Sequence, residues 1–169
     1  MLLASIILLK ANYLGTSFIG DVIVILYLLV LPALSVVLGG MATGNSLSAM
    51  GSNRELRLMI AYELPLLLSV TAAIVRSGGI RLVEFTAQPV AASISGALGF
   101  IVALLCIQAE LGFIPFDMPE AETELMGGPL IEYSGPLLGL YKISNLMALL
   151  VLPLFLVTVF LGGFSTGWG

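Results

Sequence analysis

An apolar run, Gly20-Asp-Val-Ile-Val-Ile-Leu-Tyr-Leu-Leu-Val-Leu-Pro-Ala-Leu-Ser-Val-Val-Leu-Gly-Gly40, decides the fold of this chain. Its one charged residue, Asp21, stands at its beginning. The hydrocarbon core of a bilayer is about 30 Å thick and requires roughly 20 apolar residues per helical crossing. The run therefore predicts a transmembrane helix, and the position of Asp21 suits the positive end of that helix dipole.

Three other stretches have the same character, so the predicted crossings cover about 20–40, 58–75, 90–109 and 143–164. None of them alternates polar and apolar residues as a barrel strand does, and lipid leaves helices as the remaining way to pair the backbone. Apolar residues make up 59% of the chain and charged residues only 9%, which excludes a soluble globular protein. We predict an all-α membrane protein, in which one membrane domain over residues 1–169 is a bundle of about four transmembrane helices.

The chain begins with a shorter apolar segment, Met1 to Leu9. Nine residues cover about half of a bilayer, and no basic residues precede them as they would in a secretory signal. This segment predicts a partial N-terminal helix.

Charge and residue usage exclude several classes of site. A net charge of −4 with six scattered cations lacks the basic footprint that nucleic acid requires, so no nucleic-acid partner is expected. Histidine is absent and the single cysteine, Cys106, lies in an apolar stretch, so we expect no disulfide, zinc or iron–sulfur site in this chain. Proton chemistry would therefore depend on carboxyl groups.

The carboxyl groups are concentrated in one connecting segment, which we call the acidic loop, residues 110–137. It holds six of the ten acids of the chain, with no basic residue between the first and the last of them: Glu110, Asp117, Glu120, Glu122, Glu124 and Glu132. Asp117 and Glu120 fit a capping box and Gly127-Gly128-Pro129 a helix stop, so the loop is predicted to contain a short helix. On a helical wheel Glu122 turns to the apolar side, where it is either a buried proton carrier or part of a solvated acidic surface.

Glu63 is the acid placed within a predicted crossing. It lies about five residues, or roughly 7–8 Å, past the start of the apolar run at Leu58. An ionised side chain at that depth costs several kcal/mol unless it is paired or hydrated. Glu63 is thus either a proton relay or a neutral side chain that is hydrogen-bonded to another helix.

Two arginines, Arg54 and Arg57, precede that crossing, in a region where Ser52 and Glu55 fit a capping box that predicts a helix start. They are either charge partners of the acidic loop or interfacial anchors that reach lipid phosphates. Basic residues do not decide the orientation of the bundle, because they divide equally between the two sides: Arg54, Arg57 and Lys142 on one, Lys10, Arg76 and Arg81 on the other.

Two stretches resemble one family. They are Gly51-Ser-Asn-Arg-Glu-Leu-Arg-Leu-Met-Ile-Ala-Tyr-Glu-Leu-Pro65 and Pro115-Phe-Asp-Met-Pro-Glu-Ala-Glu-Thr-Glu-Leu125 with Glu132-Tyr-Ser-Gly135. Both are similar to the membrane subunit that anchors the peripheral arm of complex I and of energy-converting membrane-bound nickel–iron hydrogenases, the respiratory-chain subunit 1 family. That subunit is a helical bundle that couples electron transfer in neighbouring hydrophilic subunits to ion movement.

The resemblance implies roles for particular residues. The carboxylates that fall on the ion-coupling path of the family are Glu63, Glu110, Asp117, Glu120, Glu122, Glu124 and Glu132, with Arg54 and Arg57 as charge partners. It also implies a multi-pass protein of the cell membrane whose acidic loop faces the cytoplasm. The chain would be non-catalytic alone, with no cofactor of its own.

The implied partners are hydrophilic hydrogenase-like and iron–sulfur subunits, which would carry a nickel–iron centre and iron–sulfur clusters, and other membrane subunits including antiporter-like ones. Leu111-Gly-Phe-Ile114 is apolar where quinone-reducing members carry a polar run with an arginine, and the residues from Gly127 to Pro136 are closer to the hydrogenase and sulfane reductase branch. Family members have about eight crossings, so the resemblance implies a split gene product or an incomplete chain.

We therefore expect an ion-translocating subunit of a hydrogenase-type complex that moves protons or sodium. The quinone-chamber subunit of NADH:quinone oxidoreductase is the alternative within the family, and a passive anchor for the hydrophilic arm is the alternative of another class. A stand-alone secondary transporter would show paired repeats and broken midplane helices, which the sequence lacks.

Overall fold

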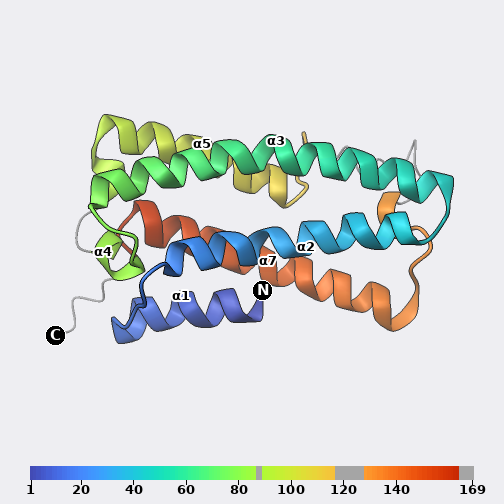
Figure 1. The fold of residues 1–169 in the computed structure, drawn as a ribbon, viewed down its shortest axis with the longest axis horizontal. Helices are drawn as coiled ribbons and strands as arrows, with labels where there is room; N and C mark the ends of the chain where they lie inside the picture. The colour runs from blue at the N-terminus through green and yellow to red at the C-terminus, as the bar shows by residue number, and fades with distance from the viewer. Residues whose placement is uncertain (87–88, 117–127, 164–169) are drawn as a thin grey trace.

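The computed structural model describes residues 1–86, 89–116 and 128–163, and these residues form an all-helical bundle (Figure 1). Its helices are α1 (Leu2–Leu14), α2 (Asp21–Ala42), α3 (Ser46–Ser77), α4 (Leu82–Thr86), α5 (Ile94–Glu110) and α7 (Gly135–Phe160), with short 3₁₀ turns η1 (Val90–Ala92) and η2 (Gly128–Leu130). The all-α prediction is confirmed. The helix predicted from Asp117 onward lies outside the described residues.

The long helices match the lengths that membrane crossing requires. Within the described part of the chain, α2, α3 and α7 are each long and apolar enough to cross a bilayer. The segment Leu82–Ala92 followed by α5 gives a fourth crossing if the two are counted as one span, bent by 104°. The prediction of about four transmembrane helices plus a short N-terminal one is therefore confirmed. The bent span is the one that corresponds to the predicted crossing at 90–109.

The start of α3 differs from the prediction. The Ser52–Glu55 capping box predicts a start near Ser52, but α3 begins at Ser46, where the Asn45 side chain accepts a hydrogen bond from the Leu47 amide. Ser52 lies inside the helix and donates its hydroxyl hydrogen to the Ser48 carbonyl. The capping-box interpretation of Ser52 was therefore wrong. Asn45 caps the helix about two turns before Ser52, and the small residues between them are compatible with a helix.

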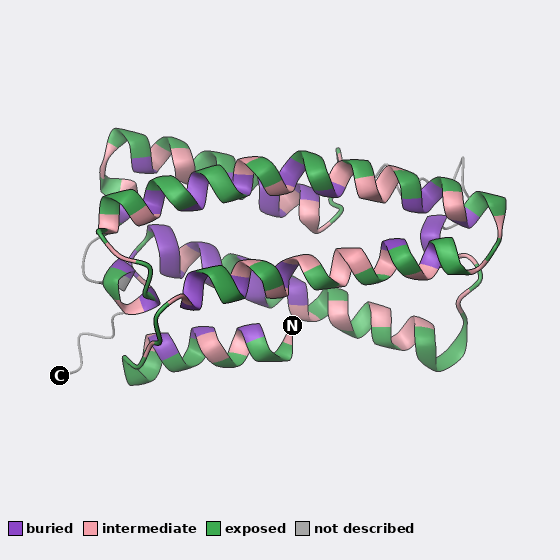
Figure 2. Ribbon diagram, viewed as in Figure 1, coloured by how far each residue is buried: buried purple, intermediate pink, exposed green. Residues whose placement is uncertain are grey.

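The bundle buries the faces on which its helices meet and exposes apolar residues on its outside (Figure 2). Ile25, Val70, Leu152 and Phe155 are buried between helices, whereas Ile94 is 86% exposed. In water such an exterior would be unfavourable, but hydrocarbon solvates it without cost. The pattern of burial therefore agrees with a helical bundle that is surrounded by lipid or by other membrane helices.

One helix is much shorter than its neighbour. α5 has 17 residues, or about 25 Å, while α3 has 32 residues, or about 48 Å. α5 packs against the second half of α3 and ends at Glu110, near the middle of the bundle (Figure 1). Beyond that point the first half of α3 has no α5 beside it.

Close contact between α5 and its neighbours depends on a glycine. A Cβ atom on Gly99 would lie 3.3 Å from the Phe160 ring of α7 and 3.7 Å from the Ser69 carbonyl of α3. The Phe160 ring itself packs edge-on against Phe100, with ring centroids 5.9 Å apart. Gly99 thus lies where three helices converge, the position at which membrane helices favour small residues.

We expect Gly99→Leu to lower the stability of the bundle by about 1–3 kcal/mol, because the added side chain must displace the Phe160 ring. Gly139→Leu is the matched control, since a Cβ on Gly139 would meet no atom within 4 Å. Thermal unfolding of the two variants in detergent would test the packing. Equal melting temperatures for both variants would contradict it.

Candidate functional site

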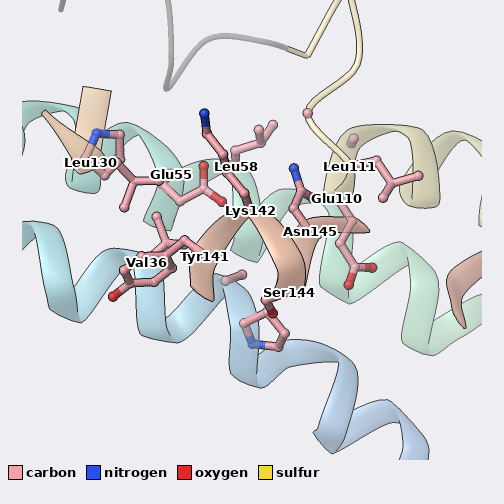
Figure 3. A pocket seen from close by; sticks show the side chains of 15 residues that line it. Val36, Glu55, Leu58, Glu110, Leu111, Leu130, Tyr141, Lys142, Ser144 and Asn145 are labelled. Atoms are coloured by element: carbon pink, nitrogen blue, oxygen red, sulfur yellow. The ribbon is translucent and has the colours of Figure 1, made fainter. Parts of the chain in front are cut away.

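The space beyond the end of α5 is a cavity of about 300 Å³. Its walls come from α2, α3, η2 and α7, and Glu110 and Leu111 close it on the α5 side. The polar side chains among its lining residues are Glu55, Glu110, Tyr141, Lys142, Ser144 and Asn145 (Figure 3). A volume of this size accommodates several waters beside ionisable groups.

A second, much smaller cavity lies on the other side of Glu110. It measures about 20 Å³ and is lined by apolar residues of α2 and α3 together with Tyr62, Glu63 and Glu110. That volume holds about one water molecule. Glu110 therefore borders both the large cavity and the small one.

Three carboxylates are brought together by this arrangement, and we call Glu55, Glu63 and Glu110 the inner carboxylates. All three are half-buried. Glu63, Glu110 and the buried Tyr62 all line the small cavity, and Glu55 and Glu110 both line the large one. Acids from α3 and α5 that are distant in sequence therefore form one interacting group.

The helical repeat explains the placement of the α3 residues. Glu55 and Tyr62 are seven residues apart, which puts them on one face of α3, and Glu63 follows directly. Because Tyr62 faces the core of the bundle, Glu55 is turned in the same direction. The Ser52–Glu55 pattern predicts a cap for Glu55 and not a place in the cavity wall, although the spacing of seven from Tyr62 contains that signal.

The predicted site residues divide into three groups. Glu63 and Glu110 lie together, as just described. Glu132 is exposed and accepts a hydrogen bond from the Asn45 side chain, 2.5 Å from nitrogen to oxygen, at the beginning of α3. The other predicted coupling acids lie outside the described residues: Asp117, Glu120, Glu122 and Glu124.

The cations Arg54, Arg57 and Lys142 lie on α3 and α7. Arg54 is half-buried and Arg57 is exposed in the first half of α3. Their pairing with the acidic loop stays a prediction, because four of the six loop carboxylates lie outside the described residues. Lys142 of α7 lines the large cavity between Glu55 and Glu110 in Figure 3. From the sequence, Lys142 bears only on the orientation of the bundle, and its place in the cavity wall is not predicted.

Among the residues that the structure describes, no group of three or more histidine, cysteine, aspartate or glutamate side chains is placed to hold a metal ion. Cys106, on α5, is buried and forms no disulfide. The chemistry open to the inner carboxylates is the uptake and release of protons or of a hydrated cation.

We expect Glu110→Gln to stabilise the protein at alkaline pH by on the order of 1 kcal/mol, because the substitution removes an ionised carboxylate that is partly buried and lies near a second one, Glu63. The gain should shrink as the pH falls, since protonated acids do not repel. Melting temperatures of wild type and variant between pH 5 and 9 would measure it. Glu84→Gln, at an exposed position, is the control, and its melting temperature should differ from that of the wild type by the same amount at every pH. A gain in stability that does not depend on pH for Glu110→Gln would contradict the proposed cost of the ionised carboxylate.

Comparison with known proteins agrees with the motif resemblance. The family model described as NADH dehydrogenase matches residues 1–169. An H subunit of NADH-quinone oxidoreductase from Geobacter metallireducens is 37% identical over 135 residues, which are 79% of this chain and 41% of the relative. The corresponding protein of Bacillus mycoides is 35% identical over 134 residues, 78% of this chain and 40% of the relative.

The protein of the same name from Geobacillus thermodenitrificans is 34% identical over 144 residues, which are 82% of this chain and 43% of the relative. The chain thus spans about two fifths of the length of these curated relatives. The names of the relatives favour the complex I alternative over the hydrogenase-type expectation, within the one family that the sequence motifs indicated. Since the family model matches the whole of it, the chain belongs to the NADH dehydrogenase family.

Proposed function

We propose that this chain is an ion-coupling membrane subunit of a respiratory redox complex, and that the inner carboxylates carry the coupled ion through its bundle. The observation that carries the proposal is the position of Glu110, which lines both the large cavity and the one-water cavity beside Glu63. A carboxyl group that borders two separate cavities is suited to accept a proton from one and deliver it to the other.

Mutual repulsion supplies the coupling. Glu63 and Glu110 interact electrostatically, so a proton or cation that neutralises one of them makes ionisation of the other less costly. A charge that changes in a neighbouring redox subunit would act on the same group through a medium of low dielectric constant. The loop acids Asp117, Glu120, Glu122, Glu124 and Glu132 would continue this path toward the cytoplasm.

Glu63, Glu110 and Glu55 can be tested one at a time by substitution with glutamine in the assembled complex. We expect ion translocation per electron to fall at least several-fold for Glu110→Gln and Glu63→Gln, because the amide takes no part in proton transfer, while electron transfer continues. Translocation and electron transfer would be measured together in proteoliposomes.

Glu84→Gln serves as the control because Glu84 is exposed and lines neither cavity. A passive anchor would keep full translocation in all of these variants. Unchanged translocation in both Glu110→Gln and Glu63→Gln would therefore remove the proposed role and leave anchoring.

The relatives are named as H subunits of NADH-quinone oxidoreductase, and on this ground we propose that the complex is of the complex I type, with quinone as electron acceptor. Its partners would be the hydrophilic arm and the other membrane subunits, in the cell membrane, with cofactors in the hydrophilic arm. The apolar Leu111-Gly-Phe-Ile114 favours the hydrogenase branch as the second candidate.

Isolation of the complex from membranes would separate these two candidates. For a complex I type we expect NADH-dependent quinone reduction that quinone-site inhibitors block, and no nickel. A preparation that contains nickel, evolves hydrogen and is insensitive to those inhibitors would instead establish the hydrogenase branch.

A further inference from the structure

The wall of the large cavity includes a segment held by unusually close contacts. This segment is η2, Gly128–Leu130, of which Pro129 and Leu130 line the cavity. Gly128 and Pro129 are buried between α2 and α3. η2 ends two residues before Glu132, so its position also fixes the approach of the chain to Glu132.

A serine joins η2 to both helices. Ser48 of α3 is completely buried, and its hydroxyl oxygen lies 2.8 Å from the Pro129 carbonyl and 2.9 Å from the Gly40 carbonyl of α2. One hydroxyl hydrogen serves two acceptors, so Ser48 bridges α2 and η2 from its place on α3. Loss of Ser48 would remove this hydrogen bond from the buried Pro129 carbonyl, which is costly, whereas the Gly40 carbonyl would still accept the Thr43 hydroxyl at 2.9 Å.

Two glycines make the close approach possible. A Cβ on Gly51 would lie 2.9 Å from the Gly128 carbonyl carbon and the Pro129 nitrogen, which are backbone atoms that cannot move independently. A Cβ on Gly40 would overlap the Ser52 hydroxyl and lie 3.1 Å from Pro129. Any side chain at Gly51 must therefore push η2 away from α3.

We propose that Gly40, Ser48 and Gly51 form a seat for η2, and that this seat sets the wall of the cavity lined by Glu55 and Glu110. The three residues are then positioning residues for ion coupling: they touch no ion but hold Pro129 and Leu130 where the cavity needs them. This inference rests on the proposed function of the inner carboxylates. The hydrogen bond from the Asn45 side chain to Glu132 holds the chain two residues after η2, so it also helps to keep η2 in place.

The seat can be tested with Ser48→Ala and Gly51→Ala. Each has a matched control: Ser35→Ala removes an exposed hydroxyl that is bonded only within its own helix, and Gly139→Ala adds a Cβ that meets no atom within 4 Å. The first measurement is amide hydrogen exchange over residues 128–133 in the assembled complex, where the Tyr133 amide donates to the Leu130 carbonyl at 3.0 Å.

We expect exchange of this segment to be roughly fivefold to tenfold faster in Ser48→Ala, the change that corresponds to the loss of one buried hydrogen bond, and also faster in Gly51→Ala. Both control variants should match the wild type. Unchanged exchange in Ser48→Ala and Gly51→Ala would overturn the proposal that these residues hold η2 in place.

The second measurement is ion translocation per electron in the same four variants. We expect a fall of at least twofold in Ser48→Ala and Gly51→Ala at an electron-transfer rate close to wild type, and no change in the controls. Faster exchange with normal coupling, while Glu110→Gln still lowers coupling, would refute the positioning role and leave the proposed function intact. Normal coupling in Glu110→Gln would instead refute the proposed function, whatever the exchange data show.

Discussion

The structure depends on the contact between α5 and α3 and on the point at which that contact ends. Gly99 lets α5 approach α3 and α7 closely, and α5 ends at Glu110, about halfway along α3. Everything that characterises the candidate site follows from this termination. The large cavity is lined by the last residues of α5 together with α2, α3, η2 and α7, and the acid at the end of α5 therefore lies among side chains of several helices.

The remaining elements define that interior. α2 and α7 contribute apolar and polar wall residues, with Lys142 as a cation on the α7 side, and η2 closes the wall between α2 and α3. The contacts of Ser48, Gly40 and Gly51 leave η2 little freedom, whereas the cavity it borders is open enough for several waters. In the proposed function, a rigid frame around a space large enough for several waters would suit controlled proton movement.

Much of the fold could be predicted from the sequence, because each long apolar run, such as 20–40, leaves a helix as the one structure that pairs its backbone in lipid. Glu63 was recognised by its depth and Glu110 by its place in the acidic loop. Their meeting could not be predicted, since it depends on where α5 ends relative to α3. Glu55 was assigned to a cap for a local reason, its spacing from Ser52, yet Asn45 caps the helix and leaves Glu55 to line the cavity. Local patterns identified elements here, while tertiary packing decided which side chains share a space.

The unequal size of the two cavities has a consequence for energy conservation. A continuous file of water across a bundle would conduct protons back down their gradient and dissipate the energy stored in it. Here the wide compartment ends at Glu110, and beyond it there is room for about one water beside Glu63. In the proposed function, passage would be limited to moments when the Glu110 side chain itself takes on a charge carrier, and the narrow compartment would then act as an insulating step between the two sides of the membrane.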